Sequence, residues 1–438
     1  MNPRSRDAAA PTLAAARGLA AGNQPTAAEQ AYARVLEIEP DHPEALHFLG
    51  LGALRRNDRR RAVEMLQQAA CAAPRDPVIL KDLGIAYLSD GRLPEAVSTL
   101  RRALDVSADA FVARLYLGNA LERLGDIRGA LVSYLRAIKT AQLQGRWLND
   151  STTPPGLREN LKHAMRYVDE RRRALFAEAF EPLRTRYGSA ALGRVERALT
   201  MHLGDIPQER PDPRQRPKYF YFPDLPAHPY FERRQFPYLA ELEARFEAIR
   251  DEAAGVLSAG NALEPFLKLS SPAQQEQFLH GSAGPPAWDA FFFYRHSEAH
   301  QQNCRACPHT AASLESLPLV RIRAHAPEIC FSVLTPGTTI LPHHGVTNTR
   351  LVAHLPLIIP EDCALRVGGE SRAWHERQCL IFDDTYEHEA WNRSSHLRVV
   401  LILDVWNPHL TEPERVAVAE LVATIGDLNR ESKADGTP

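Results

Sequence analysis

The chain has 438 residues, 44% of them hydrophobic, which is enough for two or three domains with substantial cores. Its formal net charge of −2 gives no bulk electrostatic reason to expect nucleic acid as a partner. No stretch long enough to cross a bilayer is free of charge, so we expect no membrane span. Six cysteines are too few for a disulfide framework, and the Ala-rich N-terminus lacks the apolar region of a signal peptide. A cytoplasmic protein is therefore expected.

A period of 34 residues runs through the N-terminal third of the chain. The dipeptide Leu-Gly and a later alanine both recur at this interval, at Leu49-Gly50, Leu83-Gly84 and Leu117-Gly118 and at Ala62, Ala96 and Ala130. Small residues are needed where two helices approach closely, and the pattern resembles the tetratricopeptide repeat, a pair of antiparallel helices. We count three clear repeats and a partial earlier one over residues 8–142.

Stacked helix pairs of this kind form a curved surface. We expect it to hold a peptide or protein partner, with a spacer or an oligomerisation element as the alternative. The sequence identifies neither the partner nor the oligomeric state.

The composition changes after a helical connector and a proline-rich linker, which we place at residues 143–212. From Ile329 onward, short apolar runs alternate with turn residues, as in "ICFSVLTPG", "LVAHLPLIIP" and "HLRVVLILDVW". This pattern predicts a β-sandwich or barrel, and a double-sheet jelly roll would hold a small ligand between its sheets. We assign residues 213–415 to this domain and residues 416–438 to a C-terminal helix and tail.

Two of these strands carry polar groups in unusual places. In "RLVAHLPLI", the alternation of a strand puts Arg350, Val352 and His354 on the face opposite the packed leucines. Arg398 begins a strand that is apolar on both faces, and a buried guanidinium needs an anion. That anion is either a carboxylate from a neighbouring strand or a bound ligand, and the residues alone leave both open.

Two segments, "FSVLTPGTTILPHHGVTNTRLVAHLPLIIP" and "LIFDDTYEHEAWNRSSHLRVVLILDVWNPHLT", closely resemble the aspartyl/asparaginyl β-hydroxylases. These are double-stranded β-helix oxygenases that use Fe(II), 2-oxoglutarate and O2, and helical repeats ahead of the catalytic domain are familiar among them. The resemblance covers roughly residues 215–415. It implies a multidomain α + β chain, an α-helical tetratricopeptide-repeat solenoid followed by a jelly-roll, cupin-like double-stranded β-helix domain.

The resemblance also assigns roles to single residues. His343 and His388 fall on the iron ligands, with His344 as the competing choice for the first. Ser332 and Arg398 fall where the family grips the distal carboxylate of 2-oxoglutarate, and an arginine–carboxylate pair is a strong, oriented anchor. His354 falls at the metal-chelating end of the co-substrate.

Two departures from wider patterns concern the same region. Most 2-oxoglutarate oxygenases carry a third, carboxylate ligand two residues after the first histidine. Here that position is Gly345, an absence that the resembled family shares and that leaves a halogenase as a minor alternative. Val352 stands where the family leads us to expect an arginine. Arg350, on the same face, partly replaces that cation, so we count it with His343 and His388 as catalytic.

Other candidate groups allow two interpretations. Asp383 and Asp384 either orient His388 or form an ordinary turn. Cys304, Cys307 and His309 suggest zinc, but no second cysteine pair accompanies them, which favours free thiols.

We therefore expect a 2-oxoglutarate-dependent dioxygenase, and the resemblance implies hydroxylation at the β-carbon of an aspartyl or asparaginyl residue in a peptide or protein. A lipid or a free amino acid is an alternative substrate. The alternative from another class is a repeat-containing adaptor whose barrel only binds ligands. A zinc hydrolase is weaker, because two histidines fall short of the usual three protein ligands.

Overall fold

The computed structural model describes residues 3–260, 263–268, 271–282 and 284–431. They divide into two compact units. Unit 1 contains the described residues up to Leu175 together with those from Asp427 onward, and unit 2 contains the described residues from Phe176 to Gly426. None of the described helices combines the length and the apolar character that a bilayer crossing demands.

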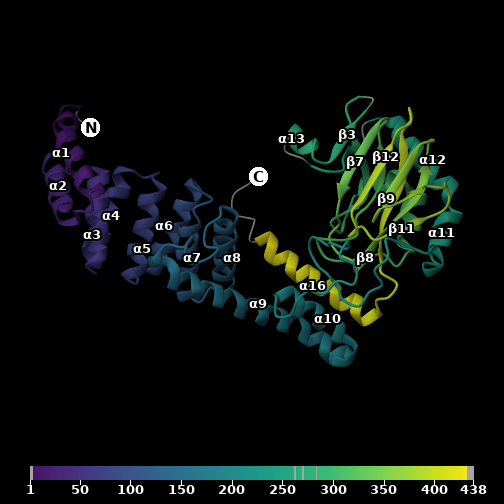
Figure 1. Cartoon of the computed structure of the whole chain (residues 1–438), viewed down its shortest axis with the longest axis horizontal. Helices are drawn as coiled ribbons and strands as arrows, with labels where there is room; N and C mark the ends of the chain where they lie inside the picture. Colours follow the sequence, from purple (N-terminus) through teal and green to yellow (C-terminus); the bar gives the residue numbers. More distant parts are fainter. Residues whose placement is uncertain (1–2, 261–262, 269–270, 283, 432–438) are drawn as a thin grey trace. The chain divides into compact units, whose positions relative to one another are not determined.

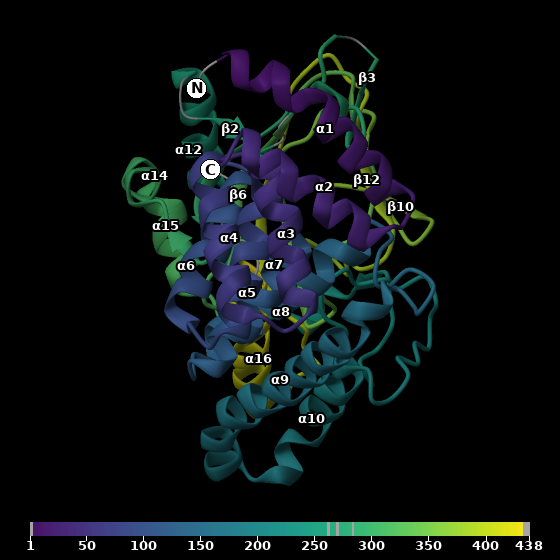
Figure 2. The same ribbon diagram turned by 90° about the vertical axis from the view of Figure 1, so that its left-hand side faces the viewer.

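Unit 1 begins with helices that pack as consecutive antiparallel pairs (Figures 1 and 2). Their bounds are α1 (Pro3–Ala21), α2 (Pro25–Ile38), α3 (Pro43–Arg55), α4 (Arg59–Ala72), α5 (Pro77–Ser89), α6 (Leu93–Val106), α7 (Phe111–Arg123) and α8 (Ile127–Leu143). The repeated glycines lie where the two helices of a pair meet. A Cβ atom on Gly84 would lie 2.5 Å from Cγ of Leu100, and one on Gly118 would lie 2.6 Å from Cδ1 of Tyr134. The close approach of the paired helices thus explains why a glycine recurs every 34 residues.

The connector consists of η1 (Pro155–Leu157), α9 (Arg158–Tyr187) and α10 (Ser189–Leu203), and α9 runs across the boundary between the units. Residues 205–229 of unit 2, which we name the strap, run ahead of the first strand without forming a helix. Backbone N–H groups of the strap donate to the carbonyls of two loops, from Arg216 to Thr385 (2.8 Å) and from Lys218 to Gly345 (3.0 Å). The proline-rich segment that we interpreted as a linker therefore packs on the domain that follows it.

Unit 2 is built on two antiparallel sheets. The larger has the order β1-β11-β8-β13-β6-β4-β2, with β5 beside β4, and the smaller has the order β10-β9-β12-β7-β3. Their bounds are β1 (Tyr230–Phe231), β2 (Glu264–Pro265), β3 (Leu279–Gly281), β4 (Trp288–Arg295), β5 (Glu298–Ala299), β6 (Ile329–Leu334), β7 (Thr338–His343), β8 (Arg350–Ile358), β9 (Cys363–Val367), β10 (Glu370–Ala373), β11 (Leu380–Phe382), β12 (His388–Asn392) and β13 (Arg398–Trp406).

Alternation along the strands separates two cores. The outer face of the larger sheet, with Leu355 and Leu403, packs against helices (Figure 1). The inner face, with Val352 and Val400, packs against Leu365 of the smaller sheet. Besides α10 and the end of α9, the helices of unit 2 are η2 (Arg233–Gln235), α11 (Leu239–Ala244), α12 (Phe246–Ala259), α13 (Pro272–Gln275), α14 (Gln301–Ala306), α15 (Pro308–Glu315) and most of α16 (Glu412–Glu431).

The expected fold class is confirmed: helical repeats precede an antiparallel two-sheet domain, and the space between its sheets holds the candidate site.

Candidate active site

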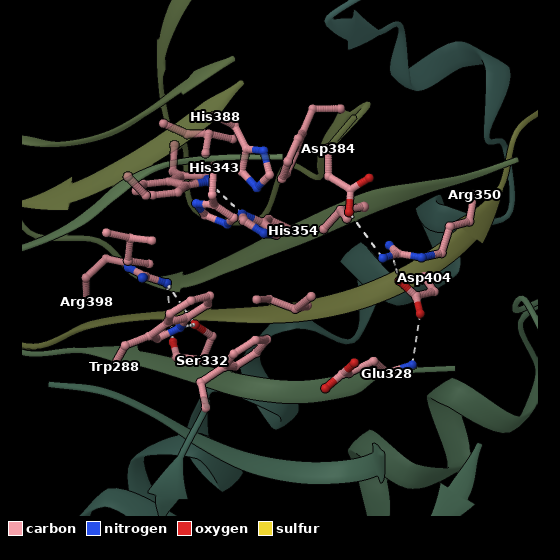
Figure 3. Close-up of a pocket in the computed structure, with 18 residues that line it drawn as sticks. Trp288, Glu328, Ser332, His343, Arg350, His354, Asp384, His388, Arg398 and Asp404 are labelled. Carbon is pink, nitrogen blue, oxygen red and sulfur yellow. Dashed lines mark hydrogen bonds and ion pairs between the residues drawn. The ribbon is translucent and has the colours of Figure 1, made fainter. Parts of the chain in front are cut away.

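Two imidazoles from the smaller sheet face each other across neighbouring strands. His343 ends β7, His388 begins β12, and the two residues are direct partners in the antiparallel register. Their ring centroids lie 4.1 Å apart (Figure 3). In each ring Nδ1 donates to a backbone carbonyl two residues earlier, to Leu341 (2.8 Å) and to Tyr386 (3.0 Å). Because Nδ1 holds the proton in both rings, each Nε2 keeps a lone pair for a ligand.

The surroundings keep these imidazoles neutral. Burial, together with the neighbouring ring, lowers the pKa of His388 to about 3, and burial also lowers the pKa of His343. A neutral imidazole is the form that binds a metal ion. His344, the competing choice, directs Nδ1 to the carbonyl of Thr385 (3.0 Å) and does not line the cavity.

A buried cation lies further along the inner face of the larger sheet. Arg398 is only 1% exposed, and burial lowers its pKa to about 10. Its Nη1 lies 3.4 Å from Oγ of Ser332, and its guanidinium lies 5.1 Å from the ring centroid of Trp374. Among the described residues no carboxylate pairs with it, and its Nε has no hydrogen-bond partner. The side chain is thus ready to receive an anion.

Tryptophans complete this end of the cavity. Trp374 donates from Nε1 to Nδ1 of His354 (3.2 Å), so the proton of His354 lies on Nε2 and is available to a ligand. Trp288 donates from Nε1 to Oγ of Ser332 (2.9 Å), which leaves the serine hydroxyl proton free. The sequence analysis missed both tryptophans. The alternation in "WDAFFFYR" was the available signal for Trp288, whereas nothing in the sequence connects Trp374 with His354.

Arg350 lies between two carboxylates. It donates from Nη1 to Asp404 (2.8 Å) and from Nη2 to Asp384 (3.1 Å), as Figure 3 shows. Burial raises the pKa of Asp404 to about 6, although Arg350 opposes this shift. The cation that we expected to replace an arginine at position 352 is therefore already paired within the protein.

The position of Asp384 also explains why the residue two places after His343 is a glycine. A Cβ atom on Gly345 would lie 2.1 Å from Cγ of Asp384, so the aspartate occupies the space of the missing side chain. Asp384 is 6% exposed, and its Oδ1 has no hydrogen-bond partner among the described residues. Asp383 instead bonds Thr385 and Gln215 of the strap. Of the two aspartates, Asp384 reaches the cavity and Asp383 fixes the turn.

The six predicted site residues all line one cavity of about 170 Å³ between the sheets: Ser332, His343, Arg350, His354, His388 and Arg398. Within the described chain, no group of three or more His, Cys, Asp or Glu side chains is arranged to hold a metal ion. The site thus offers two imidazole ligands, and the Cys304–Cys307–His309 segment gains no support as a zinc site.

The fold and the site define a two-sheet domain of the jelly-roll kind with two facing histidines between its sheets. Residues 243–408 match the family model described as Aspartyl/Asparaginyl beta-hydroxylase, and residues 53–115 match Tetratricopeptide repeat. Residues 243–408 are therefore similar to an aspartyl/asparaginyl β-hydroxylase domain and lie behind a tetratricopeptide-repeat segment, and the resemblance seen in the sequence is confirmed.

Three curated relatives illustrate the range of the match. The human "Aspartate beta-hydroxylase domain-containing protein 2" is 35% identical over 53% of this chain and 61% of its own length. The human "Aspartyl/asparaginyl beta-hydroxylase" is 28% identical over 86% of this chain and 45% of its own length. The "Ornithine lipid ester-linked acyl 2-hydroxylase" of Rhizobium tropici is 35% identical over 43% of this chain and 63% of its own length. The chain thus spans less than two thirds of each of these relatives.

Proposed function

We propose that the protein is an Fe(II)- and 2-oxoglutarate-dependent dioxygenase that hydroxylates an aliphatic carbon. One observation carries the proposal: a buried guanidinium, which has no carboxylate partner among the described residues, shares a cavity with two neutral imidazoles whose Nδ1–H groups are held by backbone carbonyls. The guanidinium does not stabilise the protein by itself, because an unpaired buried charge costs several kcal/mol. Both the guanidinium and the imidazoles fit an iron-bound dicarboxylic acid.

The donor set suits Fe(II). Imidazole is a suitable ligand for iron, and two protein ligands leave the remaining positions to the co-substrate, oxygen and water. The backbone hydrogen bonds of Nδ1 hold His343 and His388 in the ligating tautomer. Asp384 Oδ1 would accept a hydrogen bond from water on the side where Gly345 provides no ligand.

The co-substrate would be held from the other side of the cavity. Arg398 and the hydroxyl of Ser332 would bind the distal carboxylate of 2-oxoglutarate, and Nε2–H of His354 would donate to its metal-binding end. Trp288, stacked on Phe266 at 4.0 Å between ring centroids, closes the wall and excludes water. Bound iron with 2-oxoglutarate and O2 would supply the oxidation, in which 2-oxoglutarate becomes succinate and carbon dioxide while one oxygen atom enters a substrate C–H bond.

The test begins with metal-free protein, to which Fe(II), 2-oxoglutarate and then oxygen are added while succinate is measured. The wild-type protein should form succinate only with Fe(II), and His388→Ala should reduce the rate by at least about 100-fold, because one of two protein ligands is lost. Mn(II) binding, followed by electron paramagnetic resonance, should weaken in the same variant. His396→Ala, at an exposed site, is the matched control. Succinate formation that survives His388→Ala would refute the assignment, and a non-catalytic adaptor would form none in any variant.

The names of the family and of the relatives suggest the finer assignment, the β-carbon of an aspartyl or asparaginyl residue in a peptide or protein. An acyl lipid is the second candidate, favoured by the Rhizobium tropici relative and by apolar lining residues such as Val352 and Ile402. Mass spectrometry of a peptide library and of a lipid extract, each searched for a gain of one oxygen, separates the two.

The repeats of unit 1 would recruit a peptide or protein partner, as the match to tetratricopeptide repeats suggests. We also propose the cytoplasm as the compartment.

A further inference from the structure

The cavity has a cationic end and an acidic end. Antiparallel register places Glu328, Asp404 and Val352 side by side on the inner face of the larger sheet, just before β6, on β13 and on β8. Asp404 accepts the backbone N–H of Glu328 (2.9 Å) and is the register partner of Val352. Glu328 is four residues from Ser332, about 13 Å along an extended strand. The two ends are thus far enough apart for two ligand groups.

At the acidic end, the carboxylates outnumber the guanidinium groups that could neutralise them. The carboxylates of Glu328, Asp384 and Asp404 line this end of the cavity with one guanidinium, that of Arg350, while Arg398 lies at the cationic end. Arg350 pairs with Asp384 and Asp404. Glu328 is half-buried, and within the described chain no side chain forms an ion pair or a hydrogen bond with its carboxylate. Its side chain extends into the cavity in Figure 3.

The described side chains that line this end offer a substrate carboxylate no free cation. Arg350 would have to leave one of its two partners, and Val352 offers only methyl groups. Like charges near one another in a partly buried site are repelled, whereas an opposite charge is bound through a charge-assisted hydrogen bond. The buried, unpaired Oδ1 of Asp384 adds a further acceptor in the same cavity.

We infer that the substrate presents a positively charged hydrogen-bond donor, an ammonium or guanidinium group, to Glu328. The inference rests on the proposed function for the reaction and adds the substrate class. It orders three polar side chains by their charge: the ammonium group of ornithine binds best, the neutral amide of asparagine binds less well, and the carboxylate of aspartate binds worst. The amine could belong to an amino acid residue or to the headgroup of an amino lipid, since both present the same group.

The experiment measures binding to the full chain loaded with Mn(II), with and without 2-oxoglutarate, by isothermal titration calorimetry. The probes are the N-acetyl amides of ornithine, asparagine and aspartate, and N-decanoyl-ornithine amide represents the lipid source. We expect the N-acetyl amide of ornithine to bind at least about tenfold more tightly than that of aspartate, as one additional charge pair allows. A further gain for the decanoyl compound would indicate a lipid, and equal affinity would indicate an amino acid or peptide.

Glu328→Gln keeps the size of the side chain and removes its charge. It should remove most of the preference for ornithine over aspartate and leave 2-oxoglutarate affinity unchanged, whereas the exposed Glu361→Gln should change neither. Val352→Arg, which adds a cation beside Asp404, should shift the preference towards aspartate. Thermal unfolding verifies that each variant is folded.

The outcomes distinguish a failure of the proposed function from a failure of the inferred substrate class. If 2-oxoglutarate does not bind to the wild-type protein, the proposed function is wrong, while the amine preference is still measured in its absence. If 2-oxoglutarate binds and ornithine shows no advantage over aspartate, or if Glu328→Gln keeps the advantage, the substrate inference is wrong.

Discussion

Replacing Arg398 by methionine should have opposite effects on the empty and the ligand-bound protein. Burial lowers the pKa of Arg398 from the usual 12.5 to about 10, and each pKa unit corresponds to about 1.4 kcal/mol. Keeping the guanidinium charged in the folded state therefore costs roughly 3 kcal/mol. Both pKa values exceed 9, so this penalty is constant between pH 5 and pH 9.

Methionine removes the charge and keeps most of the side-chain volume. The variant also loses the interaction of the guanidinium with Trp374, which is worth about 1–2 kcal/mol in a dry site. The free energy of unfolding of ligand-free Arg398→Met should therefore equal that of the wild-type protein or exceed it by up to about 2 kcal/mol. Removing a buried arginine usually destabilises a protein, so this result would be distinctive.

The ligand-bound state should respond in the other direction. A ligand at 100 times its dissociation constant stabilises a protein by about 2.7 kcal/mol. In the presence of Mn(II), 2-oxoglutarate should give the wild-type protein a stabilisation of this order, and Arg398→Met should lose most of it. Urea unfolding with and without 2-oxoglutarate measures both effects, and Arg393→Met, at an exposed site, is the control. Destabilisation of the ligand-free variant by more than about 2 kcal/mol, or an undiminished response to 2-oxoglutarate, would refute the reasoning.

Three further predictions concern packing and charge elsewhere. Gly84→Ala should destabilise unit 1 by about 1–3 kcal/mol in urea unfolding, because its Cβ atom would lie 2.5 Å from Cγ of Leu100. Gly193→Ala, on an exposed face of α10 with no neighbouring atom within 4 Å, should instead stabilise unit 2 by roughly 0.5–1 kcal/mol. Arg214 lowers the pKa of Asp212 to about 2, so this pair should contribute stability above about pH 4 that is lost as the pH falls towards 2. Unfolding measured at a series of pH values should show that Asp212→Asn removes this part of the dependence.

Local patterns made much of the fold predictable. The period of 34 residues is visible because each repeat needs a small residue where its helices meet, as Gly118 meets Tyr134. The alternation of a strand was sufficient to direct His354 and Arg350 inward, and the structure places both on the cavity. The family resemblance supplied the remaining site residues, such as His388, whose roles no local pattern could assign.

Contacts between distant segments could not be predicted in this way. Arg350 is held by carboxylates that follow it by 34 and 54 residues, so its pairing depends on the register of three strands. No sequence pattern pointed to Glu328 as a cavity residue. Its place depends on the hydrogen bond from its backbone N–H to Asp404, which is in turn the register partner of Val352. The strap read as a linker because its prolines interrupt the helical pattern, and its hydrogen bonds to loops more than 100 residues later leave no trace in the sequence.

The strap and β1, which follows it directly, have a consequence for dividing the chain. The family match begins at residue 243, but a polypeptide starting there would lack β1, so β11 would become an open edge of the larger sheet. It would also lack the backbone donors that secure the loops beside His343 and His388. We therefore expect the smallest independently folding piece to begin well upstream of residue 243, because a shorter piece would lose the support of the loops beside the two proposed metal ligands.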